Sequence, residues 1–242
     1  MYEGLKIIAI APCYNEEVKI GKVVERIQGM NTPVVDEILI VDDGSTDGSA
    51  EVVRKLGATV ISLDRVIGVG AALRAGFEYA VAKNYDVIVV LAGNNKDEPN
   101  EIPDLLCPIV REQAFFVQGS RFLKAGSRGH MPLYRKFATR LHPLLFSMCT
   151  GKYVTESTNG FRAFRAVLLR NPHIRLNQAW LDEYELEPYL YYKAITLGYK
   201  TSEVACTKIY PPKQIGYTKM KPITGWWSIL RPMFLLKTGL RS

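Results

Sequence analysis

The chain alternates between short apolar runs and longer segments whose apolar residues recur every three or four positions. Five runs are predicted β-strands: 6–12, 36–43, 58–63, 86–92 and 114–121. Four segments between them have the spacing of amphipathic helices: 16–29, 47–57, 70–84 and 99–112. Strands that alternate with helices are typical of an α/β fold. We therefore expect an open, mostly parallel sheet with helices on both faces.

The alternation becomes less regular after about residue 124. A basic loop and an amphipathic helix are expected within 124–151, and a turn followed by a strand or short helix at 157–164. A long helix is expected over 180–200, with acidic residues near its start, and a further strand over 201–211. We expect one domain over 1–210, followed by a basic and aromatic tail over 211–242.

Polar residues follow three of the predicted strands at their carboxyl ends, in the segments 11–17, 39–47 and 89–99. In open α/β sheets, ligands bind in a crevice beyond the carboxyl ends of the strands. Any one polar loop has the simpler explanation that strands end at the surface. That explanation accounts less well for Asp42, Asp43 and Asp47 beside Asn15 and Glu16. The sequence therefore predicts a single polar binding crevice.

Composition narrows the choice of ligand. The chain has 242 residues, of which 48% are apolar, and a net charge of +7. This charge suits an anionic partner such as a nucleotide diphosphate, a lipid phosphate or a membrane surface. No nucleic-acid-reading motif is present, so no nucleic-acid partner is expected. The chain opens without a signal peptide and has no uninterrupted apolar run of about 18 residues. We therefore expect a cytoplasmic protein that meets a membrane only at its surface.

The ordered motifs resemble the family-2 inverting glycosyltransferases of the GT-A fold, and especially the polyprenyl- and dolichyl-phosphate sugar synthases. The resemblance extends over roughly residues 5 to 210. The matching segments are 11–17, 37–49, 68–77, 89–103, 118–122, 157–164 and 184–204. The resemblance implies a sugar nucleotide as donor, transfer with inversion, and a lipid phosphate or a lipid or glycan hydroxyl as acceptor. A role in polysaccharide or glycolipid biosynthesis follows from it.

The resemblance also implies a set of donor-binding residues. These are Pro12, Tyr14, Asn15, Glu16, Asp42, Asp43, Gly70, Arg74, Asn94 and Lys96. The family often has a lysine between the two glycines of the 68–70 loop, where this chain has Val69. A diphosphate needs backbone N–H groups, a cation or a metal to hold its charge. We expect Arg65 or Arg74 to replace the missing lysine.

The chain departs from the family at the end of the fourth strand. The family usually has Asp-x-Asp there, whose acids bind Mg²⁺ or Mn²⁺, but this chain has Ala92 and Asn94. In one interpretation a divalent metal still binds through Asn94, Asp43 and Asp97. In a second, the ammonium group of Lys96 takes over part of the metal's work. In a third, the protein is a catalytically silent relative that only binds nucleotide.

The acceptor side carries its own candidates. The candidates for a catalytic base are Asp182, Glu183, Glu185 and Glu187. Of these, Asp182 or Glu183 would act as the base if the acceptor is a hydroxyl, whereas a phosphate acceptor is already ionised and needs none. The alternative is that both acids only cap a helix. The resemblance implies that the acceptor-binding residues are Arg121, Thr158, Asn159 and Arg162.

Two segments combine cationic and large apolar residues, as helices on an anionic bilayer do. The basic residues are Arg128, Arg135, Lys136, Arg140, His142, Lys219, Lys221, Arg231 and Lys237. The large apolar residues are Met131, Leu133, Phe137, Leu141, Leu144, Trp226 and Trp227. We expect peripheral contact with a membrane. The alternative is that these segments pack on the domain itself or on a second copy in a homodimer.

Overall fold

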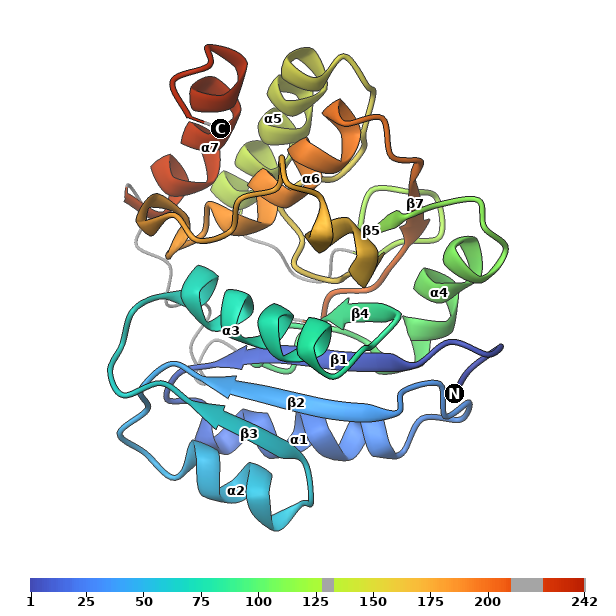
Figure 1. Ribbon diagram of the computed structural model, residues 1–242, viewed down its shortest axis with the longest axis vertical. Coiled ribbons are helices and arrows are strands. Elements are labelled where there is room, and N and C mark those ends of the chain that lie inside the picture. Colours follow the sequence, from blue (N-terminus) through green and yellow to red (C-terminus); the bar gives the residue numbers. More distant parts are fainter. Residues whose placement is uncertain (128–132, 210–223, 242) are drawn as a thin grey trace.

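Seven strands form one sheet in the described part of the chain (Figure 1). The computed structural model describes residues 1–127, 133–209 and 224–241. The strands are β1 (Ile7–Cys13), β2 (Glu37–Asp42), β3 (Thr59–Ser62), β4 (Val87–Val90), β5 (Phe116–Ser120), β6 (Arg162–Arg165) and β7 (Thr201–Ala205). Their order is β3-β2-β1-β4-β6-β5-β7, and each of the five strands predicted at the start of the chain is present.

The direction of β6 decides which residues meet at the sheet edge. β6 runs antiparallel to β4 and β5, whereas β1 pairs in parallel with β2 and β4, and β5 with β7. Val90, the last residue of β4, lies opposite Arg162, the first residue of β6. The segment before β6 therefore reaches the same edge as the carboxyl ends of the parallel strands. The predicted fold class, an open and mostly parallel sheet, is confirmed.

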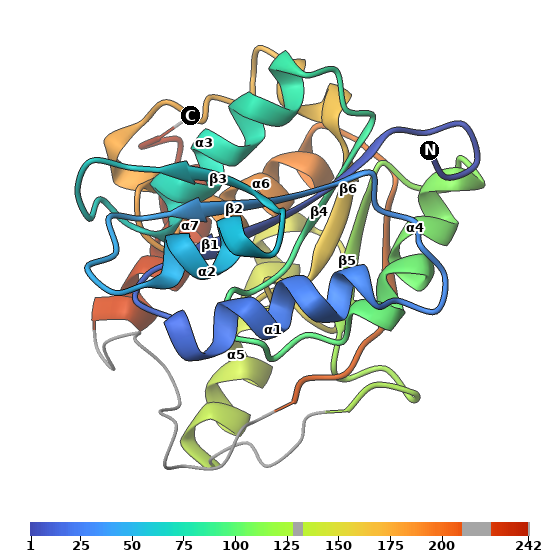
Figure 2. The same cartoon turned by 90° about the horizontal axis from the view of Figure 1, so that it is seen from below.

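Helices cover both faces of the sheet, as Figures 1 and 2 show. One face is covered by α1 (Glu17–Gln28), α2 (Ser49–Lys55) and α4 (Ile102–Val110). The other is covered by α3 (Val69–Ala82), α5 (Leu133–Thr150), α6 (Leu186–Thr196) and α7 (Thr224–Lys237). Side chains of a strand point alternately to its two faces, so Ile8 and Ile10 join the second core while Ile7 and Ala9 join the first.

The predicted helix over 180–200 begins later than expected. Residues 179–181 form the short 3₁₀ helix η3 (Ala179–Leu181), and α6 begins only at Leu186. The backbone before α6 is held against the start of α3, where Ala71 N–H donates to the carbonyl of Asp182 at 3.0 Å. Asp182 and Glu183 thus lie in a turn ahead of the helix, and the expectation that they belong to its first turn is wrong.

The last helix, α7, joins the core formed with α5 and α6. Met233 is fully buried in that core, and Arg231 forms an ion pair with the buried Glu185 on the segment before α6, with 2.6 Å between Nη2 and Oε1. Burial raises the pKa of Glu185, although Arg231 opposes this effect. Residues 211–223 of the predicted tail lie outside the described residues. The division into a domain and a tail stays a prediction.

Several residues of the predicted membrane-contact segments cannot be placed. Arg128, Met131, Lys219 and Lys221 lie outside the described residues. The same holds for the side chains of Leu133, Arg135, Lys136, Phe137 and Trp226. Among the helices that are described, none has the length and apolar character needed to cross a membrane.

Candidate active site

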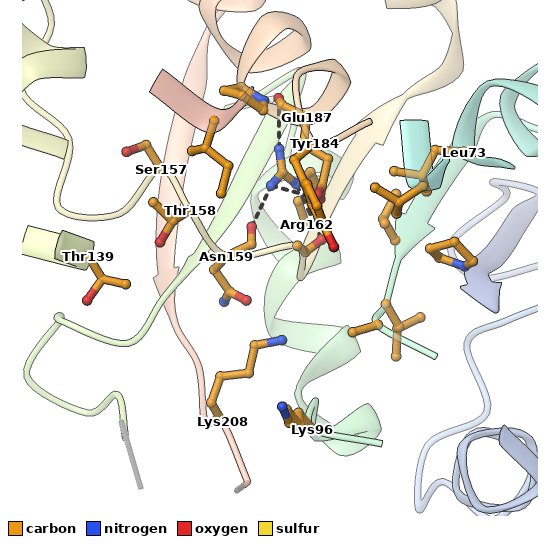
Figure 3. A pocket seen from close by; sticks show the side chains of 18 of the residues that line it. Leu73, Lys96, Thr139, Ser157, Thr158, Asn159, Arg162, Tyr184, Glu187 and Lys208 are labelled. Atoms are coloured by element: carbon orange, nitrogen blue, oxygen red, sulfur yellow. Dashed lines mark hydrogen bonds and ion pairs between the residues drawn. The ribbon is translucent and has the colours of Figure 1, made fainter. Parts of the chain in front are cut away.

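A pocket of about 230 Å³ opens at the edge of the sheet where β4 ends and β6 begins (Figure 3). Its polar and charged lining residues are Lys96, Arg121, Thr139, Ser157, Thr158, Asn159, Arg162, Tyr184, Glu187 and Lys208. Its apolar walls include Pro12, Val69, Leu73, Val90, Leu91, Pro188 and Ile229. Six of the predicted site residues meet here: Pro12, Lys96, Arg121, Thr158, Asn159 and Arg162.

Arg162 is the most deeply buried of the four cations in this pocket, with 2% of its surface exposed. Its Nη2 donates to the Asn159 carbonyl at 2.5 Å, and its Nη1 donates to the Glu187 carbonyl at 3.0 Å. Nη2 also lies 3.2 Å from the Glu187 carboxylate. Burial lowers the pKa of Arg162, and the charge of Glu187 opposes this. These contacts fix the guanidinium at the start of β6, as Figure 3 shows.

Arg121 follows β5 and is held by a buried acid. Its Nε donates to Glu156 Oε2 at 2.7 Å, and its Nη2 donates to Thr158 Oγ1 at 2.9 Å. Burial raises the pKa of Glu156, but Arg121 and the Thr158 N–H outweigh this effect, so the pKa is lowered overall. The Glu156 carboxylate is therefore charged and orients both Arg121 and Thr158 at the pocket.

Lys208 reaches the pocket from the segment after β7 and forms an ion pair with Asp97. The other carboxylate oxygen of Asp97 accepts a hydrogen bond from the Ala92 N–H at 2.8 Å. Asp97 thus bonds to the start of the loop after β4 through Ala92 and joins that loop to the segment after β7 through Lys208. The Ile209 N–H also donates to the carbonyl of Lys96 at 2.8 Å. Lys96 and Lys208 therefore line the same end of the pocket.

The loop after β4 is fixed from its other side by α1 and β1. Arg26 of α1 donates to Asn95 Oδ1 at 2.7 Å and forms an ion pair with Glu98 at 2.6 Å. A Cβ on Gly93 would lie 2.4 Å from the carbonyl oxygen of Pro12, so only glycine permits this approach. The loop that carries Lys96 and Asp97 is therefore held in one position.

The predicted donor-binding loops after β1 and β2 are joined by hydrogen bonds. The Ser45 N–H donates to Asp42 Oδ1 at 3.1 Å, and the Asn15 N–H donates to Ser45 Oγ at 2.9 Å. Asp43 Oδ1 accepts hydrogen bonds from the N–H groups of Ile67 and Gly68, at 2.8 and 3.2 Å. Asp42 and Asp43 are both buried. The two loops thus form one rigid surface next to α3.

The outer residues of these loops complete the donor set. Tyr14 keeps 36% of its surface exposed, while Glu16 forms an ion pair with Lys19 at 2.8 Å. Neither lines the pocket, and nor do Asn15, Asp42 and Asp43. Their donor-binding roles stay predictions.

Gly70, Arg74, Asp182 and Glu183 also lie outside the pocket lining. A Cβ on Gly70 would lie 2.0 Å from the carbonyl oxygen of Leu181, so this glycine accommodates the turn before α6. Arg74 Nη2 donates to Asp182 Oδ1 at 2.6 Å, and Glu183 is exposed. Tyr184 of the same turn and Glu187 in the first turn of α6 line the pocket instead. The catalytic roles of Asp182 and Glu183 stay predictions.

The residues predicted to hold a metal do not form a ligand set that fits one. Asp97 uses both carboxylate oxygens on Lys208 and Ala92, and Asp43 Oδ1 already accepts two hydrogen bonds. Asn94 Oδ1 is buried without a hydrogen-bond partner, but it is a single neutral oxygen. No group of three or more His, Cys, Asp or Glu residues able to hold a metal occurs in the part of the chain that the structure describes.

A buried histidine, His142, bonds to two of the residues that line the pocket. His142 Nε2 lies 3.1 Å from the carbonyl of Ile229, and Nδ1 lies 2.7 Å from Ser157 Oγ. Because a carbonyl only accepts, Nε2 donates and Nδ1 accepts from the Ser157 hydroxyl. Burial lowers the pKa of His142 to about 4. His142 is thus a neutral residue that connects α5, α7 and the segment before β6, and the expectation that it takes part in membrane contact is wrong because it is buried.

Sequence reasoning missed Ser157, Tyr184 and Lys208 as lining residues, whereas Glu187 was among the acids considered as a catalytic base. Ser157 and Tyr184 lie inside the motifs that carried the resemblance, and this was the signal that could have found them. Lys208 lies in a segment that was interpreted only as a strand. Its importance depends on a contact with Asp97, which is 111 residues away in the chain.

Comparison with known proteins gives a consistent picture. Residues 8–175 match the sequence model described as "Glycosyl transferase family 2". An undecaprenyl-phosphate mannosyltransferase of Micrococcus luteus is 28% identical over 221 residues, which cover 89% of this chain and 88% of the relative. A UDP-N-acetylglucosamine–dolichyl-phosphate N-acetylglucosaminyltransferase of Methanococcus voltae is 29% identical over 181 residues, covering 68% of this chain and 71% of the relative.

The fold also has a counterpart among solved structures. Glucosyl-3-phosphoglycerate synthase from Mycobacterium tuberculosis, in complex with Mn²⁺, UDP and glucosyl-3-phosphoglycerate, superimposes with a TM-score of 0.69. The match covers 99% of this chain and 82% of that chain at 20% sequence identity. At this identity the likeness shows a shared fold, and it confirms the predicted GT-A architecture.

Proposed function

This chain belongs to glycosyl transferase family 2 and is a glycosyltransferase, and on that premise we propose that it transfers a sugar from a nucleoside-diphosphate sugar to the phosphate of a polyprenyl lipid. The relatives named above act on undecaprenyl and dolichyl phosphates, which supports this class of acceptor. The sugar reaches the acceptor with inversion at its anomeric carbon.

The observation that carries the proposal is the set of four cations in one pocket. Lys96, Arg121, Arg162 and Lys208 all line it at the edge of the sheet where ligands of this fold class bind. A donor diphosphate and an acceptor phosphate together bring several negative charges into such a site. Preorganised cations and hydrogen-bond donors stabilise the charge that develops on the leaving diphosphate.

The carboxylates around the pocket favour a phosphate acceptor over a hydroxyl. Among the described lining residues, Glu187 is the single carboxylate, and it is paired with Arg162. Asp182 and Glu183, the two predicted bases, do not line the pocket, and Asp182 is paired with Arg74. A hydroxyl acceptor must lose a proton, whereas a phosphate oxygen already carries negative charge. A site whose acids are engaged by arginines suits the acceptor that needs no base.

The reaction then requires one displacement. A phosphate oxygen of the lipid attacks the anomeric carbon from the face opposite the leaving group. The bond from that carbon to the donor's β-phosphate oxygen breaks, and the nucleoside diphosphate leaves with the electron pair. No proton is transferred. The protein contributes by holding the two reactants in line and by stabilising the leaving diphosphate. No step is assigned to a metal, because the residues present do not fit one.

An enzyme that uses a lipid acceptor must reach the membrane in which that lipid lies. Leu144 and Met148 on α5 and Trp227 and Phe234 on α7 are large apolar side chains with at least 46% of their surface exposed. These two helices pack against each other and lie at one end of the molecule (Figure 1). We propose that this end faces the membrane from which the acceptor is drawn.

Product analysis tests the proposed function. The full chain is incubated with radiolabelled UDP- and GDP-sugars and with either a short-chain polyprenyl phosphate or the matching polyprenol. We expect a labelled sugar–phosphate lipid from the phosphate and none from the alcohol. Transfer to the alcohol alone would contradict the proposed acceptor. Nucleotide binding without transfer to either lipid would support the silent-relative alternative.

A further inference from the structure

Lys96 and Lys208 lie at the lower end of the pocket in Figure 3. Their ammonium groups can bind phosphate oxygens in place of a metal ion. Building on the proposed function, we propose that this chain holds the donor diphosphate without a divalent metal, and that the ammonium groups of Lys96 and Lys208 supply the positive charge. The site would then bind a nucleoside diphosphate in the presence of a chelator.

Lys208 is positioned for this role by the carboxylate of Asp97. The lysine has 7% of its surface exposed and the acid 3%. A buried ammonium group persists in its charged form when it is paired, and the pair here fixes it at the pocket wall. Asp97 is the acid of the loop after β4 that one interpretation of the sequence made a metal ligand. In this chain it binds a cation of the protein itself.

Lys96 brings a second ammonium group to the same loop. It also has 7% of its surface exposed, and it lines the pocket beside Ala92 and Leu91. Its backbone carbonyl accepts the N–H of Ile209, so the segments that carry the two lysines are hydrogen-bonded to each other. An ammonium group is a compact charge that binds phosphate oxygens well. With the charge of Asp97 counted, the two lysines leave one net positive charge at this end of the pocket.

The same arrangement disfavours a divalent ion. Ala92 offers no ligand, Asn94 offers one neutral oxygen, and Asp97 is neutralised by Lys208. Hard divalent cations require several oxygen ligands, usually including carboxylates. The net positive charge of Lys96, Lys208 and Asp97 would also repel a further cation. Where the family has a pair of acids, this chain has Ala92 and Asn94, and the cations Lys96 and Lys208 accompany this change.

Calorimetric titration of the full chain with UDP, GDP and dTDP tests the proposal. Each titration is run in EDTA, in Mg²⁺ and in Mn²⁺. We expect at least one nucleotide to bind in EDTA with a dissociation constant within about threefold of the value with metal. Binding that requires a metal, or that weakens more than about tenfold in EDTA, overturns the inference but leaves the proposed function standing. If no nucleotide binds under any condition, the proposed function itself is contradicted.

Substitution of the lysines tests which residues carry the charge. We expect Lys96→Met and Lys208→Met each to weaken nucleotide binding in EDTA by about tenfold to a hundredfold. Lys55→Met, at an exposed position on α2, serves as the matched control and should change nothing. Because Lys208→Met leaves Asp97 buried without its cation, the double variant Asp97→Asn/Lys208→Met is measured as well. Unchanged binding in both Lys208 variants would contradict the assignment.

Asp97→Asn distinguishes a diphosphate held by the lysines from one held by a metal on Asp97, because the two predict opposite changes in nucleotide affinity. Asparagine keeps an oxygen for the Ala92 N–H but no longer neutralises Lys208. If the lysines hold the diphosphate, binding in EDTA should be retained or become up to about tenfold tighter. If Asp97 were a metal ligand, the same change would weaken binding in the presence of Mg²⁺ or Mn²⁺. Weaker binding of this variant in Mg²⁺ or Mn²⁺ with unchanged binding in EDTA, and with the fold confirmed by circular dichroism, therefore contradicts the lysine assignment.

Discussion

At the scale of single residues, the site consists of charges that are buried in pairs. Arg121 with Glu156, Arg162 with Glu187 and Lys208 with Asp97 each join a cation at the pocket to an acid that orients it. A buried charge without a partner is costly, so each acid also stabilises the burial of its cation. Glu156, Glu187 and Asp97 therefore affect substrate binding by orienting the cations with which they are paired.

His142 gives the molecule a testable pH dependence. Its pKa is lowered by burial from 6.5 to about 4, so the unfolded chain binds its proton at a higher pH than the folded chain does. Stability is therefore full above pH 6.5 and falls as the pH drops from 6.5 toward 4. Between pH 6.5 and pH 5 we expect a loss of about 2 kcal/mol. Urea denaturation at a series of pH values measures it.

His142→Gln should reduce the slope of the free energy of unfolding against pH, between pH 5 and 6.5, by about 1.4 kcal/mol per pH unit. His173 is exposed, and His173→Gln is the matched control whose profile should follow the wild type. Glu156, which faces His142 and has a lowered pKa, contributes its own loss of stability only below its ordinary value of 4.5. An unchanged slope in His142→Gln between pH 5 and 6.5 would contradict this explanation.

Individual residues also show what sequence could and could not reveal. Arg121, Thr158, Asn159 and Arg162 were predicted from motifs, and the pocket does bring them together. The pairing of Asp97 with Lys208 could not be predicted, because the two residues approach each other only after β7 has joined the sheet. Local patterns carry no information about such a contact.

At the scale of elements, the contact between α3 and the turn before α6 positions Tyr184 and Glu187. Gly70→Ala would place a methyl group 2.0 Å from the carbonyl oxygen of Leu181, and that backbone cannot yield as a flexible side chain would. Helix propensity alone would favour the change by about 1 kcal/mol. We therefore expect a lower melting temperature and reduced transfer activity, measured by calorimetry and by the transfer assay. A variant more stable than the wild type would show that this contact is loose.

Elements were predicted well where their signal is local. The apolar runs of β1, β2 and β4 and the periodicity of α1 and α3 gave their positions to within a few residues. The antiparallel direction of β6 was not predicted, because a four-residue strand carries no signal of its direction. The late start of α6 has a similar cause, since the turn before it is set by contact with Gly68 and Gly70.

At the scale of the whole molecule, the exposed apolar side chains of α5 and α7 predict binding to lipid. In sedimentation with vesicles that contain anionic phospholipid, we expect Leu144→Gln/Met148→Gln to weaken binding by about tenfold, because two apolar side chains no longer enter the bilayer. Val18→Gln on α1, also exposed but on the other side of the sheet, is the control and should bind as the wild type does. Equal binding by all three proteins would place the lipid contact elsewhere.

The bond between Asp97 and Lys208 has a consequence for the newborn polypeptide. A ribosome releases the loop after β4 long before it has made residue 208, and until then Asp97 lacks its cation. The first strands and the 68–70 loop precede Lys208 in the chain, so the set of cations that lines the pocket is complete only when most of the chain has been made. Fragments that end before Thr207 should therefore fail to capture nucleotide, however well their first strands assemble.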